Sequence, residues 1–295
     1  MNYASLDISL AAVIPAILLA VFVFLKDKTE KEPLPLLLLL FGLGAVAFFP
    51  AHYAENALIS LFDTAFADFF EFTTEGGMTV LSEAAYYCHR ALCYFVGVGL
   101  VEESIKWILL FLITRKSVHF NYLFDGIVYA VFLSMGFSAV ENVWYAWLNG
   151  WDTLLLRSLS SVPGHLFFGI MMGCFYSIWH TRYAAKCEER RFAGAGLLTV
   201  KKPFSSGGWL AAAFIVPILL HGGYCFVGYF SSSSITLGFY LVTTILYLLC
   251  FYFINRMSDA DVATNRSVVA LLKKKYPDYE TAAEVQANEG VSGNE

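Results

Sequence analysis

The chain has 295 residues, of which 58% are hydrophobic and 15% are charged, and its formal net charge is −5. Soluble domains are on average about 45–50% apolar and about 25% charged, so this composition indicates a protein with several membrane spans. The mild negative charge argues against a nucleic-acid-binding protein. Six scattered cysteines without a CxxC pair indicate neither a disulfide framework nor a zinc ribbon.

Apolar segments long enough to cross about 30 Å of hydrocarbon predict an all-α, polytopic membrane bundle of about seven transmembrane helices. In chain order, the predicted spans are 8–25, 34–49, 91–114, 123–148, 162–180, 209–230 and 235–254. The second span is short, because Pro50 is expected to end it. Residues 51–62 are expected to continue as an interfacial helix that carries Glu55.

Basic residues predict the orientation of these spans. The segments 26–33, 115–122, 181–207 and 255–295 hold three, two, six and five Lys or Arg residues, respectively. The alternate loops hold only Arg90 and Arg157. Because basic loops stay on the cytoplasmic side, we expect the N-terminus outside and the C-terminus inside.

The end of the chain is predicted to be a polar cytoplasmic tail over residues 255–295, after a transmembrane bundle over residues 1–254. Residues 259–275 are expected to form an amphipathic helix on the inner membrane surface. The chain beyond Pro277 is expected to be disordered.

Ionisable side chains inside a bilayer are costly and tend to be functional, so their positions are informative. The predicted spans contain Glu102, Glu103, Lys106, Glu141, His165 and His221. With a rise of 1.5 Å per residue, the carboxylates and imidazoles from four spans lie at depths of about 5 to 16 Å below the outer surface. The spans therefore bring these groups to a similar level in the outer half of the membrane.

Two Glu and two His side chains at one level suit either a metal with an open water position or an acid/base cluster. Lys106 follows Glu102 by four residues and Glu103 by three, so all three share one helix face. Lys106 can therefore neutralise one carboxylate and leave the other to act as a base. The pairing also makes burial of the carboxylates less costly.

Each polar site also has a structural interpretation. Glu102, Glu103 and Lys106 could form an ion pair that joins helices, and Glu141 with Asn142 could form interhelical hydrogen bonds. His165 and His221 could each be a buried polar residue with a satisfied hydrogen bond. These interpretations account for each site separately but leave the shared depth unexplained.

Four motifs occur in a recognisable order. The segment 102–106 reads EExxK, 137–142 reads FxxxEN, His165 lies in PGHLFFG and His221 lies in LLHGGYCF. Their order, spacing and placement in successive spans resemble the PrsW family of intramembrane proteases. That family is related to the group of CAAX prenyl proteases and bacteriocin-processing enzymes. The likeness covers about residues 90–230, which we take as the catalytic core.

The resemblance implies hydrolysis of a peptide bond within or beside a bacterial plasma membrane. The family's known substrates are single-span membrane regulators such as anti-sigma factors, cut on the extracytoplasmic side as the first step of regulated proteolysis. By analogy, Glu102 is the base that activates water and Glu103 orients it or assists. By the same analogy, Glu141, His165 and His221 either bind a metal or polarise the water and stabilise the oxyanion. Supporting residues are Lys106, Asn142 and Phe137. Three protein ligands plus water are typical of catalytic zinc.

Related sequences often have Asp or Asn four residues after the last histidine, where this chain has Cys225. Because Cys225 lies one helical turn after His221, both can face one cavity. Cys225 is then either a small apolar residue that fills space or a thiolate ligand.

Two other functions fit the same composition. Intramembrane Glu, Lys and His also build proton relays, so an ion- or proton-coupled transporter is one alternative. The lack of an evident inverted repeat argues against it. A relative without catalytic activity that binds membrane partners is the other alternative.

Overall fold

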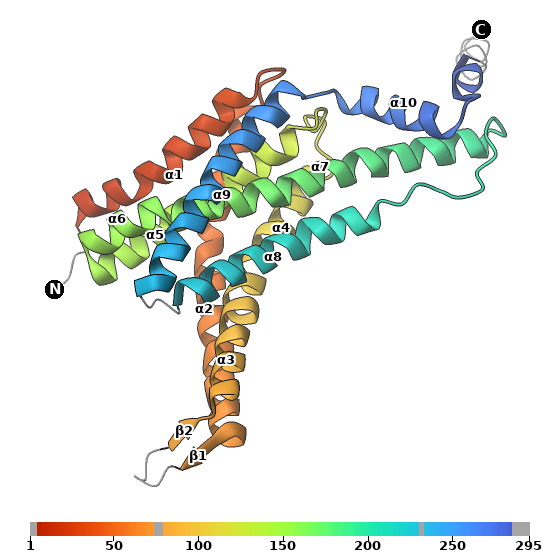
Figure 1. Cartoon of the computed structure of the whole chain (residues 1–295). Coiled ribbons are helices and arrows are strands. Elements are labelled where there is room, and N and C mark those ends of the chain that lie inside the picture. The colour runs from red at the N-terminus through yellow and green to blue at the C-terminus, as the bar shows by residue number, and fades with distance from the viewer. Residues whose placement is uncertain (1–4, 74–78, 230–232, 285–295) are drawn as a thin grey trace.

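The computed structural model describes residues 5–73, 79–229 and 233–284, which form an almost entirely helical fold (Figure 1). The helices are α1 (Leu6–Lys26), α2 (Leu34–Phe70), α3 (Glu83–Ala91), the π-helix η1 (Leu92–Leu100), α4 (Val101–Thr114), α5 (Asp125–Asn149), α6 (Trp151–Leu159), α7 (Ser161–Gly194), α8 (Gly207–Tyr229), α9 (Ser233–Asp259) and α10 (Thr264–Lys275). A short antiparallel hairpin of β1 (Glu71–Thr73) and β2 (Thr79–Leu81) is the exception among the described residues. The predicted helical membrane fold is confirmed at this level.

Five helical segments in the described part of the chain are long and apolar enough to cross a membrane. They correspond to α1, α2, α5, the consecutive pair α6–α7 and α8. The predicted third span is an unbroken helical run in which α3, η1 and α4 follow one another. The predicted seventh span lies within α9. A count of seven spans and the orientation of the termini stay predictions.

The second helix differs from the sequence-based expectation, because α2 continues through Pro50 to Phe70. The prediction that Pro50 ends this helix is wrong. Buried side chains anchor α2 on both sides of the proline, since Phe48 and Ala51 pack in one cluster with Phe137 of α5. In membrane helices, such packing and small local adjustments compensate for the backbone hydrogen bond that a proline removes.

Helix α5 forms the centre of the bundle, with 89% of its most apolar segment buried. It contacts α1, α2 and α7. The approach to α2 depends on a pair of glycines that face each other. A Cβ atom on Gly44 would lie 1.9 Å from the carbonyl oxygen of Leu133, and one on Gly136 would lie 1.9 Å from that of Phe41. Only residues without a side chain permit the two backbones to come this close.

Away from the bundle, α2 and α3 continue as a two-helix arm that ends in the β1–β2 hairpin (Figure 1). Ser82 caps the arm's second helix, because its hydroxyl accepts a hydrogen bond from the Ala85 amide at 3.2 Å. Through η1, this second helix leads directly into α4. The arm is therefore continuous with the helix that carries Glu102 and Glu103.

The last described residues pack against α7, in contrast to the expectation for the part beyond Pro277. Val268 and Leu272 of α10 form a cluster with Ala185 and Phe192 of α7, and Tyr279 joins them. The prediction of disorder beyond Pro277 is therefore wrong as far as residue 284, and residues 285–295 lie outside the described residues. The apolar face of α10 finds its partner on the long extension of α7.

Candidate active site

A buried group of Glu102, Glu103 and Lys106 lies on one face of α4. The Nζ atom of Lys106 donates to Oε2 of Glu102 at 2.9 Å and to Oε1 of Glu103 at 3.0 Å. All three side chains are at most 2% exposed. The third donor of the ammonium reaches Nδ1 of His165 on α7 at 3.2 Å. Helix periodicity predicts this pairing, and the structure confirms it.

Phe137, on α5, lies directly beneath this ammonium. The Nζ atom of Lys106 is 3.9 Å from the centroid of the Phe137 ring, and the ring is fully buried. A cation over an aromatic face in a dry interior is stabilised by about 2 kcal/mol. Phe137 therefore supports the charged group rather than facing the cavity.

A second group of charged side chains, Glu141 and Arg157, lies on the Nε2 side of the His165 ring. Oε2 of Glu141, on α5, lies 2.8 Å from Nε2 of His165 and 2.8 Å from a guanidinium nitrogen of Arg157 on α6. Since an ammonium only donates, Nδ1 of His165 accepts from Lys106 and Nε2 carries the proton shared with Glu141. His165 is thus a neutral imidazole fixed between the two carboxylate groups.

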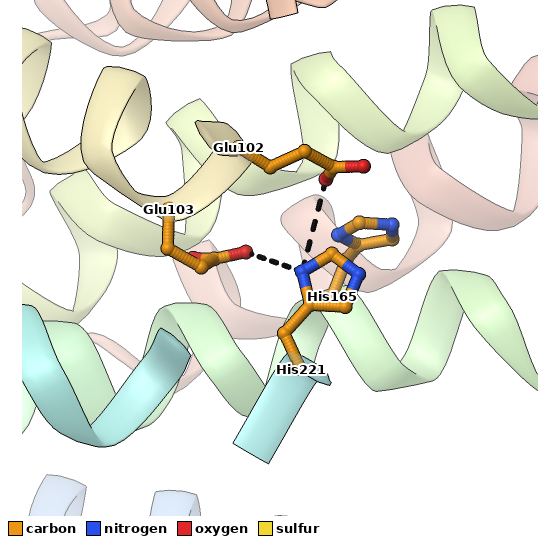
Figure 2. A group of neighbouring side chains, drawn as sticks. All are labelled: Glu102, Glu103, His165 and His221. Atoms are coloured by element: carbon orange, nitrogen blue, oxygen red, sulfur yellow. Dashed lines mark hydrogen bonds and ion pairs between the residues drawn. The ribbon is translucent and has the colours of Figure 1, made fainter. Parts of the chain in front are cut away.

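His221, on α8, faces α4. Its Nδ1 atom lies 2.9 Å from Oε1 of Glu103 and 3.8 Å from Oε2 of Glu102. Figure 2 marks both contacts with dashed lines. The rings of His165 and His221 meet nearly at right angles, with centroids 5.0 Å apart. The Phe168 ring stacks on His221 with centroids 4.7 Å apart.

Glycines set the distance between the helices that carry these groups. A Cβ atom on Gly99 of η1 would lie 2.8 Å from the carbonyl oxygen of Ile218. A Cβ atom on Gly222 of α8 would lie 2.8 Å from the Cα atom of Phe95. The resulting close contact of η1 and α8 brings His221 within hydrogen-bonding distance of Glu103.

A cavity of about 400 Å³ adjoins these groups. Four of the predicted site residues line it, namely Glu102, Glu141, His165 and His221. Cys225 lines it as well, as its position one turn after His221 predicts. Glu103 is not among the lining residues and is fully buried behind its neighbour.

Asn142 is the one predicted supporting residue that points away from the site. Its Nδ2 atom donates to the carbonyl oxygen of Ala12 on α1 at 2.8 Å and to the Ser158 hydroxyl on α6 at 3.4 Å. Asn142 therefore holds α1 and α6 against α5, which is the interhelical role considered from the sequence for this motif.

Two charged residues of the cavity were not expected from the sequence. Arg157 counted only as an outer-loop charge, and Glu55 counted only as an interfacial residue after Pro50, yet both line the cavity. Glu55 joins it because α2 continues beyond the proline. A signal for Arg157 was present, since it lies between the two spans that supply Glu141 and His165.

The donors of this site suit a metal ion in kind and distance. One oxygen or nitrogen atom from each of Glu102, Glu103, His165 and His221 lies within 4.8 Å of the others. Oε2 of Glu103 is buried and has no hydrogen-bond partner among the described residues. Mixed imidazole and carboxylate donors next to a cavity are of the kind that can bind a metal ion. The Lys106 ammonium contacts three of these four residues, namely Glu102, Glu103 and His165.

The fold and the site together are typical of an intramembrane hydrolase, with its reactive groups inside a helical bundle. A family model described as "PrsW family intramembrane metalloprotease" matches residues 32–254. The chain belongs to this family and is an intramembrane protease.

Several bacterial proteins named Protease PrsW are similar to it. The protein of Oceanobacillus iheyensis is 30% identical over 257 residues, covering 86% of this chain and 97% of that protein. The protein of Bacillus subtilis is 30% identical over 217 residues, covering 74% of this chain and 80% of that protein. The protein of Clostridioides difficile is 30% identical over 226 residues, covering 75% and 79%, respectively. No solved structure gives a significant match.

Proposed function

We propose that the protein is an endopeptidase of a bacterial plasma membrane that cleaves a single-span membrane regulator, such as an anti-sigma factor, on the extracytoplasmic side. Glu102 is the general base. The main support is the convergence of Glu102, His165 and His221 from three helices on one cavity. The orientation predicted from the basic loops supports an outward-facing site, with N-terminus outside, C-terminus inside and about seven spans.

Glu102 and Glu103 take different parts in this proposal because their surroundings differ. Glu102 lines the cavity and can accept a proton from a water molecule there. Glu103 lies behind it and binds Nδ1 of His221. Lys106 holds both carboxylates in place, so the base does not depend on solvent for its orientation.

The two imidazoles are each held by a carboxylate. Glu141 binds Nε2 of His165, and Glu103 binds Nδ1 of His221. Metal-binding histidines usually donate their other ring N–H in this way, which fixes the ring and raises its basicity. We therefore propose Glu141, suggested as a ligand by the sequence, as the carboxylate that orients His165.

A metal would be held by His165 and His221 together with Glu103, and Glu102 beside them would stay free to act as the base. A bound zinc ion would supply a Lewis acid that polarises the scissile carbonyl and lowers the pKa of water.

The peptide bond is then cleaved in two proton transfers. Water adds to the scissile carbonyl carbon as Glu102 takes its proton, which leaves negative charge on the former carbonyl oxygen. Glu102 returns the proton to the amine nitrogen as the C–N bond breaks. The carboxylate is regenerated, so atoms and charge balance.

The test is cleavage of a purified single-span substrate in proteoliposomes, with the outer side of the substrate labelled. Glu102→Gln should lower the rate by about 10²–10⁴-fold, the usual contribution of a general base. Glu83→Gln, at an exposed position in the first turn of α3, is the matched control and should retain full activity. A chelator should abolish cleavage, and zinc should restore it.

Two results would contradict this proposal. Unchanged cleavage in both Glu102→Gln and His221→Ala would show that the site assignment is wrong. Ion flux in proteoliposomes without any cleavage would favour the transporter alternative.

A further inference from the structure

A second group of metal-binding side chains lies outside the cavity, where the arm joins the bundle. It consists of Asp63 on α2, His89 on α3 and Cys93 at the start of η1. One ligand atom from each of the three lies within 4.8 Å of the others. In Figure 1, α2 and α3 run side by side here, and neither the cavity nor the proposed hydrolytic site includes these residues.

The imidazole of His89 is aimed at both partners through a single nitrogen. Its Nε2 atom lies 2.8 Å from Oδ1 of Asp63 and 3.6 Å from Sγ of Cys93. His89 and Cys93 are four residues apart, so they share one helix face. The Phe66 ring packs edge-on against the His89 ring with centroids 5.0 Å apart, which limits its rotation.

These distances suit a tetrahedral metal site. With bonds of about 2.0 Å to nitrogen and about 2.3 Å to sulfur, tetrahedral N and S ligands lie about 3.5 Å apart. The observed separation of Nε2 and Sγ is 3.6 Å. To become a ligand of such a site, the Asp63 oxygen would have to move about 0.5 Å farther from Nε2 of His89. Its side chain is 61% exposed, so it is able to move.

Burial and charge also fit an ion with one open position. His89 and Cys93 are 5% and 3% exposed, respectively, which shields the nitrogen and the sulfur, whereas Asp63 opens to solvent. The neighbouring cation, Arg90, lies over the rings of Tyr86 and Tyr229. A mixed set of thiolate, imidazole and carboxylate is typical of zinc among the common divalent ions.

We propose that Asp63, His89 and Cys93 form a second metal site, which binds zinc at the junction of the arm and the bundle. Binding replaces the thiol proton of Cys93 with the metal, so one proton is released into solution. The ion would join α2 to the unbroken helical run that carries Glu102 nine residues after Cys93. The proposal does not depend on which residues hydrolyse the substrate.

Cobalt is the probe for this site, because a Co²⁺–thiolate bond gives a charge-transfer band in the near ultraviolet. We expect the full-length protein in detergent to show this band and to lose it when zinc is added. Cys93→Ser should abolish the band. Two control variants should retain it: Cys88→Ser, at an exposed position on α3, and Cys225→Ser, at the wall of the catalytic cavity.

Asp63→Asn tests the site without disturbing the fold, because the side chain is exposed. Since losing even an outer partner of a ligand costs about 10–100-fold in affinity, we expect cobalt to bind at least about tenfold more weakly. The proposal is overturned if the wild-type protein shows no band, or if Cys93→Ser keeps it. It is also overturned if Asp63→Asn binds cobalt as tightly as the wild type, which would leave the His89–Asp63 contact as a simple hydrogen bond between helices.

Discussion

Two groups of charged side chains flank His165, and the cation that neutralises each group comes from a different place in the fold. Glu102 and Glu103 share the ammonium of Lys106, which lies on the same helix. Glu141 shares the guanidinium of Arg157, which lies on another helix. The first group is assembled by local helix geometry, whereas the second exists only when α5, α6 and α7 have packed. The first should therefore control stability and chemistry together, and the second should act chiefly through the orientation of His165.

The largest effect is expected from Lys106→Met. Removing one partner of a buried ion pair costs about 3–5 kcal/mol, because the other charge is left uncompensated. Here two carboxylates lose their cation, so we expect a lower free energy of unfolding in a denaturant titration and a loss of cleavage. Lys28→Met removes an exposed pair with Asp259 and should change the free energy of unfolding little, because solvent screens the two charges. Equal losses in the two variants would contradict the role given to burial.

The second group is tested by Arg157→Gln. Glu141 would lose its ion pair and hold His165 less firmly, so we expect cleavage to slow by about 10–100-fold. Arg157→Lys keeps the charge and should recover part of the rate. As a control, Arg182→Gln removes a cation that lies over the Trp209 ring and should change little. A wild-type rate in Arg157→Gln would mean that His165 does not depend on this pair.

A substitution at Gly222, on α8, can disturb the first group of charged side chains without the second. In Gly222→Ala the new Cβ would lie 2.8 Å from the Cα atom of Phe95, so η1 and α8 must move apart. The Glu103–His221 contact should lengthen while the Glu141–Arg157 pair stays intact. A displacement of 1 Å can cost about 10²-fold, and we expect a loss of about tenfold in kcat. In Gly223→Ala the nearest atom is 3.8 Å away, so this variant should be nearly silent.

The last prediction concerns the pH dependence of stability, through a carboxylate without an ion pair among the described residues, Asp27 in the loop between α1 and α2. Both of its carboxylate oxygens are buried, and burial raises the pKa of Asp27 from 3.8 to about 6. Between these pH values the folded protein binds more protons than the unfolded chain, so the free energy of unfolding falls as pH rises. The slope corresponds to a difference of at most about one bound proton. Asp27→Asn should remove this slope and be more stable than the wild type at pH 8 but not at pH 4.

Asp259 provides the opposite sign for comparison. A hydrogen bond from Lys28 lowers the pKa of this exposed carboxyl, so its contribution is present above the ordinary value and is lost as pH falls. Thermal unfolding of Asp27→Asn and Asp259→Asn between pH 4 and pH 8, each compared with the wild type, measures the two slopes. Slopes of the same sign would contradict the contrast between the buried and the paired carboxylate.

The sequence by itself determined the membrane class and the composition of the site. Composition and long apolar segments predict a helical membrane bundle, and the EExxK spacing predicts the Lys106 pairing, because residues three and four apart on a helix are always neighbours. The order of the four motifs also identified the helices that supply Glu141, His165 and His221. These properties are local to each helix, so they do not depend on how the helices pack against one another.

Only the tertiary structure decided which of these groups touch. It turned Glu102 to the cavity and Glu103 to His221, paired Arg157 with Glu141 and brought Asp63 of α2 to His89 of α3. It also carried α2 past Pro50 and so placed Glu55 on the cavity wall. The physical reason is that these contacts depend on the rotation and separation of packed helices, which close glycine contacts and buried side chains set and which no spacing along a single helix encodes.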